Sequence, residues 1–317
     1  MKYLEVSFVC QMQSCGFFYA YNGSMLRGAL GGSLRRTVCM TQKKDCTQCM
    51  LAATCIFPRL FTAAAAPEKC GTAPMIPPPF CLLPSLEGQR VYEAGENFSF
   101  TLKLFSYAVD YLPYFIHAFT LAGRKGLGGG AEHGQGIFRI VDVVQDGRSV
   151  YDAEAECLRP CAPRDLSIPI FRSVQEEGSL DVRLLTPLRF KQENRLAADL
   201  DFFQLMLLII RRIRSLLALD GKAFLLPREE FSALARAASD VRLEKNDLVW
   251  QDWSRYSGRQ NTRMKLGGLI GRIRYRGPVA SFEEYLDFAR HVHIGKQTSF
   301  GLGAFSLAKE KEGPHES

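Results

Sequence analysis

"GLGGGAEHGQG" (residues 126–136) and "HIGKQTSFGLG" (residues 293–303) stand at matching places in the two halves of the chain. Each follows a stretch of helical character that contains Tyr-Leu, and each precedes a strand entered through a phenylalanine, Phe138 or Phe305. Glycine permits positive φ angles and lets the backbone come close to a neighbour. The two loops therefore indicate an internal repeat with one glycine-rich loop in each copy.

The elements predicted around the loops follow one order, strand–helix–strand–strand–helix–strand. In the first half, the clearest segments are residues 4–10, 23–38, 98–105, 109–123 and 137–144. In the second half, they are residues 180–190, 199–219, 246–256, 264–276, 281–292 and 303–307. This order, used twice, predicts an α+β fold of two tandem ferredoxin-like (RRM-like) domains.

The repeat also predicts the domain boundaries. Residues 1–150 form the N-terminal domain, which carries a Cys-rich insertion at residues 39–55. Residues 151–178 form a linker, residues 179–307 form the C-terminal domain with its glycine-rich loop, and residues 308–317 form a flexible tail.

Two local patterns in the second half make finer predictions. Ser281 and Glu284 have the spacing of a capping box at the start of a helix. The alternation of apolar residues slips at Gly271, which predicts a β-bulge. Beyond the slip, three arginines lie on the strand face opposite Ile273 and Tyr275: Arg272, Arg274 and Arg276. They form either a ligand-binding surface or an ordinary solvent-exposed face.

Composition narrows the class of protein. A chain of 317 residues with 47 % hydrophobic and 23 % charged residues is globular and long enough for two domains. The net charge is +7, and residues 251–276 hold seven lysines and arginines against one acid, Asp252. Such clustering indicates a polyanionic partner, most commonly nucleic acid.

We expect a cytoplasmic protein with no membrane partner. The first 13 residues include Glu5 and lack a small-residue cleavage site, which argues against a signal peptide. The apolar run at residues 202–210 is far shorter than the roughly 20 residues of a membrane span. Without secretion, ten cysteines favour intracellular chemistry or metal binding over disulfides.

The loop at residues 293–303 is a candidate anion site, because its backbone N–H groups can converge on a phosphate. Lys296 adds charge, and Thr298 and Ser299 add donors. His293 at the rim has the side chain best suited to move protons near neutral pH, which suits acid–base work on a phosphodiester. The alternatives are a plain turn and a half-buried structural histidine.

The segment "WQDWSRYSGRQ" (residues 250–260) mixes aromatic and basic side chains, as RNA-binding surfaces do. Tyr256 can stack on a base, and Arg255 and Arg259 can grip phosphates. The alternative places the tryptophans, Trp250 and Trp253, in the core, and we expect at least one of them there.

Four cysteines form the pattern C-x6-C-x2-C-x5-C: Cys39, Cys46, Cys49 and Cys55. The central C-x2-C is a common half-site for tetrahedral thiolate coordination, so we expect a structural zinc ion or, as an alternative, an iron–sulfur cluster. The competing interpretation is a set of buried free thiols.

Five segments together resemble one known family. They are "GSMLRGALGGSLRRTVC" (23–39), "GENFSFTLKLFSYAVDYLPYFIHAF" (95–119), "WQDWSRYSGRQ" (250–260), "LGGLIGRIRYRG" (266–277) and "HIGKQTSFGLGAF" (293–305). With the pattern G-h-G-x5-G-h-G near the C-terminus, they resemble the CRISPR-associated RAMP superfamily, and within it the endoribonuclease that cuts precursor CRISPR RNA in its repeats. His293 stands at the first glycine of that pattern, before Gly295, Gly301 and Gly303.

The resemblance implies cleavage without a catalytic cofactor: the 2′-hydroxyl attacks the adjacent phosphate and leaves a 2′,3′-cyclic phosphate and a 5′-hydroxyl. The family often carries a histidine on its first helix, but residues 23–38 contain none. We therefore assign acid–base catalysis to His293, phosphorane stabilisation to Lys296 with Arg255 or Arg259, and stacking to Tyr256. The RNA-binding set is Arg259, Arg263, Arg272, Arg274, Arg276, Gly295, Thr298, Ser299, Gly301 and Gly303.

The expected partners are a precursor CRISPR RNA repeat and other subunits of a CRISPR effector complex. Two other interpretations stay open: a non-catalytic RAMP subunit that retains CRISPR RNA in a ribonucleoprotein, and an unrelated metal-binding interaction protein. The second predicts no salt-dependent affinity for RNA.

Overall fold

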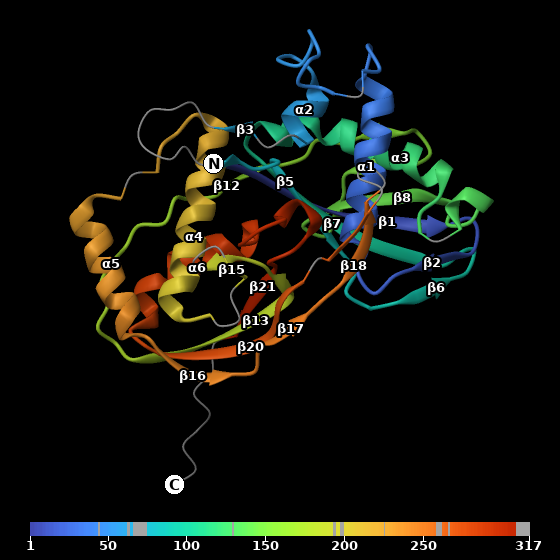
Figure 1. Cartoon of the computed structure of the whole chain (residues 1–317). Coiled ribbons are helices and arrows are strands. Elements are labelled where there is room, and N and C mark those ends of the chain that lie inside the picture. Colours follow the sequence, from blue (N-terminus) through green and yellow to red (C-terminus); the bar gives the residue numbers. More distant parts are fainter. Residues whose placement is uncertain are drawn as a thin grey trace. The chain divides into compact units, whose positions relative to one another are not determined.

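The computed structural model of the chain forms two compact units, Met1–Leu166 with Ala218–Asp220, and Ser167–Leu217 with Gly221–Ser317 (Figure 1). The division falls inside the segment predicted as a linker. The described residues are 1–43, 45–61, 64–65, 75–128, 130–192, 195–196, 200–224, 226–257, 262–265 and 267–308. The predicted tail after residue 308 lies outside them.

The first unit is built on an antiparallel sheet in the order β5-β7-β1-β8-β9, with β12 beside β1. The strands are β1 (Lys2–Met12), β5 (Phe80–Pro84), β7 (Asn97–Phe105), β8 (Phe138–Gln145), β9 (Arg148–Ser149) and β12 (Arg164–Asp165). Its helices are α1 (Gly23–Val38), α2 (Ile56–Phe61) and α3 (Leu112–Lys125), with short 3₁₀ turns η1 (Ser106–Tyr111) and η2 (Ala131–His133). Small ladders complete it: β2 (Gly16–Phe18) with β6 (Arg90–Tyr92), β3 (Ala64–Ala65) with β4 (Met75–Ile76), and β10 (Tyr151–Asp152) with β11 (Cys157–Leu158).

Alternation in β7 builds the core of this unit. Its even-numbered apolar residues from Phe98 to Leu104 are all buried, as the sequence pattern predicts. Phe100 stacks on Phe8 of β1 with ring centroids 4.8 Å apart, and Phe119 of α3 packs on both rings. Each such buried side chain contributes about 2 kcal/mol through removal from water. Pro113 lies in the first turn of α3, where its missing N–H costs nothing.

The second unit repeats the plan with the order β16-β20-β13-β21, and β17 also pairs with β20. The strands are β13 (Gly178–Leu188), β16 (Arg242–Asn246), β17 (Val249–Gln251), β20 (Gly268–Gly277) and β21 (Phe305–Ala308). The helices are α4 (Phe202–Leu217), α5 (Arg228–Asp240) and α6 (Glu283–Val292), with η4 (Val279–Phe282) and η5 (Thr298–Phe300); η3 (Ala218–Asp220) belongs to the first unit. Two hairpins extend the second unit: β14 (Lys191–Gln192) with β15 (Arg195–Leu196), and β18 (Ser254–Ser257) with β19 (Thr262–Lys265).

Both sheets place the first strand of the repeat between the third and the fourth, with the second strand beyond the third. That is the strand order of a ferredoxin-like fold, so the fold class predicted from the repeat is confirmed. In each unit, the glycine-rich loop joins the second helix of the repeat, α3 or α6, to its last strand, β8 or β21.

One local prediction, the capping box, is wrong. The helix α6 is not capped by Ser281 and Glu284, because the segment before β13 uses both side chains. The Ser281 hydroxyl donates to the Val174 carbonyl at 3.0 Å and accepts from its amide at 2.8 Å. Glu284 accepts hydrogen bonds from the Ile170 amide at 3.0 Å and from Arg172 at 2.8 Å.

The irregularity near Gly271 is real but lies on the other strand. The register between β13 and β20 shifts between the pairs Leu184–Gly271 and Leu188–Leu269, so the extra residues belong to β13. Leu269 is buried with the same parity as Ile273, and the apolar pattern of β20 does not slip there.

Candidate functional site

The loop at residues 293–303 is closed by its own hydrogen bonds. The Ile294 amide donates to the Gly303 carbonyl at 3.0 Å, and the Gly301 amide to the Thr298 carbonyl at 2.8 Å. The Lys296 amide donates to the Arg189 carbonyl at 2.8 Å. These amides are directed at protein carbonyls, and they do not converge on an open anion site.

The residues predicted to bind RNA in this loop are buried. Thr298 and Ser299 are each 5 % exposed. A Cβ on Gly303 would lie 1.8 Å from the Ile294 carbonyl oxygen, and a Cβ on Gly295 would lie 2.7 Å from the Arg189 carbonyl oxygen. Gly295 and Gly303 therefore serve the close approach of backbone segments, and Gly301 takes a positive φ of 84°. The assignment of these loop residues to RNA binding is corrected.

His293 is also not placed for the predicted role. Its side chain is 0 % exposed, and it follows α6 with φ 57° and ψ 155°. An acid or base has to touch the RNA, so a fully enclosed imidazole cannot serve in this conformation. The competing interpretation, a structural histidine, fits the burial. Lys296, three residues further along the loop, is exposed.

The aromatic and basic segment lies on the second unit beside β20. Arg255 and Tyr256 belong to β18, where Tyr256 pairs with Arg263 of β19. Arg259 lies outside the described residues. Trp250 is 40 % exposed and donates to the Asp252 carboxylate at 3.0 Å, and Trp253 is half-buried, so the expectation of a core tryptophan is wrong.

The arginines of β20 share one face, as predicted, because Ile273 and Tyr275 on the other face are buried. Arg274 forms a two-pronged ion pair with Asp181 of β13, at 3.0 and 2.8 Å. Arg276 lies 3.5 Å from Glu244. Arg272 instead stands directly opposite an arginine of β13, Arg183.

Both Arg183 and Arg272 are exposed, and within the described part of the chain no carboxylate pairs with either. Directly opposed residues of an antiparallel pair lie about 5 Å apart at Cβ, and like charges there repel. Ser306 of β21 adjoins Arg183 on its other side. The row Arg272–Arg183–Ser306 therefore offers two unneutralised guanidinium groups and a hydroxyl to an anion.

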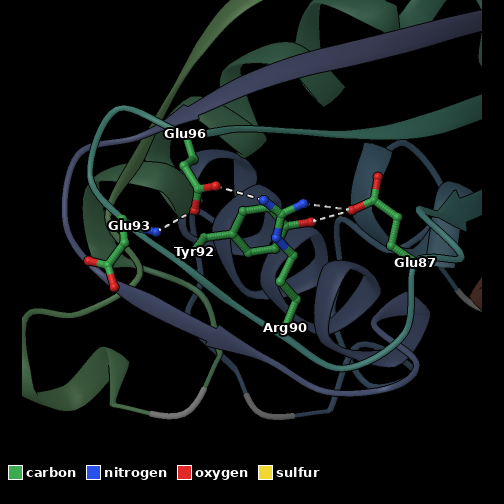
Figure 2. A network of polar contacts seen from close by, with 5 residues as sticks. All are labelled: Glu87, Arg90, Tyr92, Glu93 and Glu96. Atoms are coloured by element: carbon green, nitrogen blue, oxygen red, sulfur yellow. Dashed lines mark hydrogen bonds and ion pairs between the residues drawn. The ribbon is translucent and has the colours of Figure 1, made fainter.

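Exposed arginine alone does not make such a site, as the β6 hairpin illustrates (Figure 2). Arg90 donates to Glu87 at 3.1 Å and to Glu96 at 2.6 Å, and it lies 4.6 Å over the Tyr92 ring. The Glu93 amide donates to Glu96, which lowers the pKa of that carboxyl. The charge of Arg90 is thus neutralised within the protein.

The cysteine segment gives no support to a metal site. Cys39, Cys46, Cys49 and Cys55 are half-exposed free thiols that line one small cavity of about 20 Å³. Across the described ranges, no group of three or more His, Cys, Asp or Glu side chains is placed to hold a metal ion. The hydroxyl of Thr41 lies 3.3 Å from Cys49 Sγ, and this contact lowers the pKa of the thiol.

A larger cavity, of about 470 Å³, opens on the first unit beside its own glycine-rich loop. It is lined by α1, the end of α3 and the loop that begins at Gly126. Its polar and small residues include Gly28, Gly32, Ser33, Arg36, Lys125 and His133. The sequence marks this loop as one copy of the repeat but predicts no site there.

The side chains of this cavity carry positive charge without internal neutralisation. Arg36 donates to the buried hydroxyl of Ser33 at 3.0 Å. Lys125 and His133 are exposed, and no described carboxylate forms an ion pair with Arg36, Lys125 or His133. A glycine-bounded, cationic hollow with an imidazole at its edge suits a phosphate ester.

No helix among the described residues has both the length and the apolar character needed to cross a bilayer. This finding concerns only that part of the chain.

Two family models match separate parts of the chain. Residues 1–163, just over half of the chain, match the model AF_1859_N, described as an N-terminal domain. Residues 182–305 match the model described as CRISPR-associated endoribonuclease Cas6. The second half of the chain therefore carries a Cas6-type endoribonuclease domain. The chain is thus an endoribonuclease of the Cas6 type, as the resemblance of its motifs implies.

Relatives of this Cas6-type chain are distant. An uncharacterized protein of Archaeoglobus fulgidus is 26 % identical over 289 residues, which cover 90 % of this chain and 91 % of that protein. The structure described as "Cas6 (TTHB231) product complex" has 15 % identity and a TM-score of 0.56, and the match covers 97 % of this chain and 99 % of that one. A "Partial Cas6-RT-Cas1--Cas2 complex" has 12 % identity and a TM-score of 0.57, covering 99 % of this chain and 47 % of that one. These structures share the fold.

Proposed function

We propose that this Cas6-type chain binds precursor CRISPR RNA and cuts it within each repeat without a metal ion, leaving a 2′,3′-cyclic phosphate and a 5′-hydroxyl. RNA carries its own nucleophile, the 2′-hydroxyl, next to the scissile phosphate. Cleavage then needs a base for the hydroxyl proton, a proton for the leaving oxygen, and positive charge on the phosphorane.

The observation that best supports RNA binding is that Arg183 and Arg272 lie opposite each other in the sheet. Two exposed arginines held opposite each other in a sheet repel in the free protein. A bound phosphate between them converts that repulsion into attraction on both sides. Arg274, already paired with Asp181, takes a smaller part.

The decisive experiment is a cleavage assay with a repeat RNA in the presence of EDTA. We expect one cut per repeat, products whose 3′ end resists phosphatase until the cyclic phosphate is opened, and no cut when the 2′-hydroxyl at that position is replaced by hydrogen. Cleavage that requires Mg²⁺ and leaves a 5′-phosphate would overturn the proposal. Tight binding with no cleavage would instead favour an RNA-retaining RAMP subunit.

The double variant Arg183→Gln/Arg272→Gln tests the binding surface. Each lost phosphate contact removes about 0.7–0.9 from the slope of log affinity against log salt, so we expect a shallower slope and weaker binding at low salt. Arg90→Gln is the matched control, because its guanidinium group is already neutralised by Glu87 and Glu96. Equal salt slopes for the double variant and wild type would contradict this surface. Transfer of the cut RNA to other CRISPR effector subunits stays a prediction.

A further inference from the structure

We propose that the cavity of the first unit binds the scissile phosphate, and that His133 is the catalytic base that takes the proton from the 2′-hydroxyl. The inference rests on the proposed function and names the residues that perform it. It moves the acid–base role from the enclosed imidazole of the second unit to an exposed one in the first.

The cavity has open space where a ligand needs it. Its volume of about 470 Å³ is within the usual range for small-ligand pockets. One wall is the small-residue face of α1. A Cβ built on Gly28 meets no atom within 4 Å, and one built on Gly32 meets only the end of the Arg36 side chain, at 3.7 Å. Larger side chains at these positions would occupy the hollow.

Two basic side chains line the cavity and can bind an anion there. Arg36 comes from the last turn of α1, where the buried Ser33 hydroxyl holds one of its terminal nitrogens at 3.0 Å. Lys125 comes from the last turn of α3. Two cations from different helices, neither paired with a described carboxylate, are suited to stabilise the added negative charge of a phosphorane.

His133 is held at the rim by its backbone and leaves its ring exposed. It ends η2, between Gly130 with φ 95° and Gly134 with φ 75°. Its amide donates to the Gly130 carbonyl at 2.8 Å, and the Gly134 amide donates to the Ala131 carbonyl at 3.2 Å. The position that corresponds in the second loop holds Phe300, which is 9 % exposed. The same backbone thus presents an exposed imidazole in one unit and an enclosed apolar ring in the other.

The reaction balances with these groups and water. Neutral His133 accepts the 2′-hydroxyl proton as the 2′ oxygen bonds to phosphorus. Arg36 and Lys125 hold the charged phosphoryl oxygens while the bond from phosphorus to the 5′ oxygen breaks. Water in the open cavity protonates the leaving 5′ oxygen, and His133 returns its proton to solvent.

The test compares His133→Ala with His117→Ala, which removes an exposed histidine of α3 outside the cavity. We expect His133→Ala to cut repeat RNA at least 100-fold more slowly, within the span typical of acid–base catalysts, while RNA affinity changes less than threefold. Added imidazole should restore part of that rate, an effect that a merely structural histidine does not produce. His117→Ala should cut at the wild-type rate.

Plugging the cavity gives an independent test. A Cβ at Gly28 meets no atom within 4 Å, so Gly28→Ala fits without a clash, whereas Gly28→Met would extend into the hollow and fill it. We expect Gly28→Met to cut repeat RNA at least tenfold more slowly than wild type and Gly28→Ala to cut at the wild-type rate. Both variants should be at least as stable as wild type. If His133→Ala and Gly28→Met cut the repeat as fast as wild-type protein does, the proposed catalytic site is wrong, although the proposed function is supported. If wild-type protein does not cut at all, the proposed function itself fails.

Discussion

The two glycine-rich loops share one backbone but present different side chains. The Leu127 amide donates to the Gly136 carbonyl at 2.9 Å, and the Ile294 amide donates to the Gly303 carbonyl at 3.0 Å. Positive φ recurs at five matched positions, residues 126, 128, 130, 134 and 136 in one loop and 293, 295, 297, 301 and 303 in the other.

The difference lies in what surrounds that backbone. The first loop borders an open cationic cavity with His133 exposed, whereas the second encloses His293, Thr298 and Ser299. Glycine spacing therefore indicates how a loop closes. Whether the loop binds a ligand depends on the side chains left at its surface.

The largest expected loss of stability comes from substituting the last glycine of each loop, Gly136 or Gly303, and it tests whether the two loops share one backbone conformation. Gly136→Ala and Gly303→Ala each put a Cβ within 2 Å of a carbonyl oxygen, at 1.9 and 1.8 Å, on a residue with φ near +70°. We expect each to lower the free energy of unfolding by about 3 kcal/mol or more, measured by urea denaturation. Gly28→Ala, free of any clash, should be neutral or stabilising by up to about 1 kcal/mol. A small loss at Gly136 with a large loss at Gly303 would break the equivalence of the loops.

A smaller effect separates the arginines of β20. Arg274→Ala removes a half-buried ion pair and should cost about 1 kcal/mol of stability. Arg272→Ala relieves the repulsion from Arg183 and should leave stability within about 0.5 kcal/mol, while RNA binding weakens. Thermal melting and RNA titration of both variants check this. Equal losses of stability would contradict the distinction between a structural and a ligand-binding arginine.

The smallest effect concerns the cysteine segment, which has no counterpart in the second unit. Hydrogen bonding from Thr41 lowers the pKa of Cys49, so more of this thiol is ionised at a given pH. We expect Cys49 to react with iodoacetamide faster than Cys46 near pH 7.5, and Thr41→Val to slow it a few-fold, followed by mass spectrometry. If all four thiols resist iodoacetamide until a chelator is added, the result would instead support the predicted metal site.

Sequence reasoning succeeded where periodicity and topology decide the structure. Alternation in β7 and the repeated element order predicted a ferredoxin-like fold in both halves. The two faces of β20 were predictable for the same reason.

The site was less accessible to such reasoning, because burial depends on which elements pack over a loop. Nothing local distinguishes His293 from His133: each lies among glycines near cations. The exposure of one and enclosure of the other come from tertiary packing. Arg212 is a similar case. In the sequence it follows the apolar run at residues 202–210, as a solvent-exposed residue at the end of a helix would. In the structure it is only 5 % exposed, and its Nε donates to the Val292 carbonyl at 3.1 Å.

The most direct measurement pairs the two histidines, with stability and cleavage recorded for His133→Ala and His293→Gly. His133→Ala should unfold within about 0.5 kcal/mol of wild type, as a surface change does, while cleavage falls at least 100-fold. His293→Gly leaves a cavity and should lose about 1–3 kcal/mol of stability, although relief of its positive φ offsets part of the loss. Its folded fraction should cut RNA within threefold of wild type. Wild-type cleavage by His133→Ala together with inactive but folded His293→Gly would contradict the account.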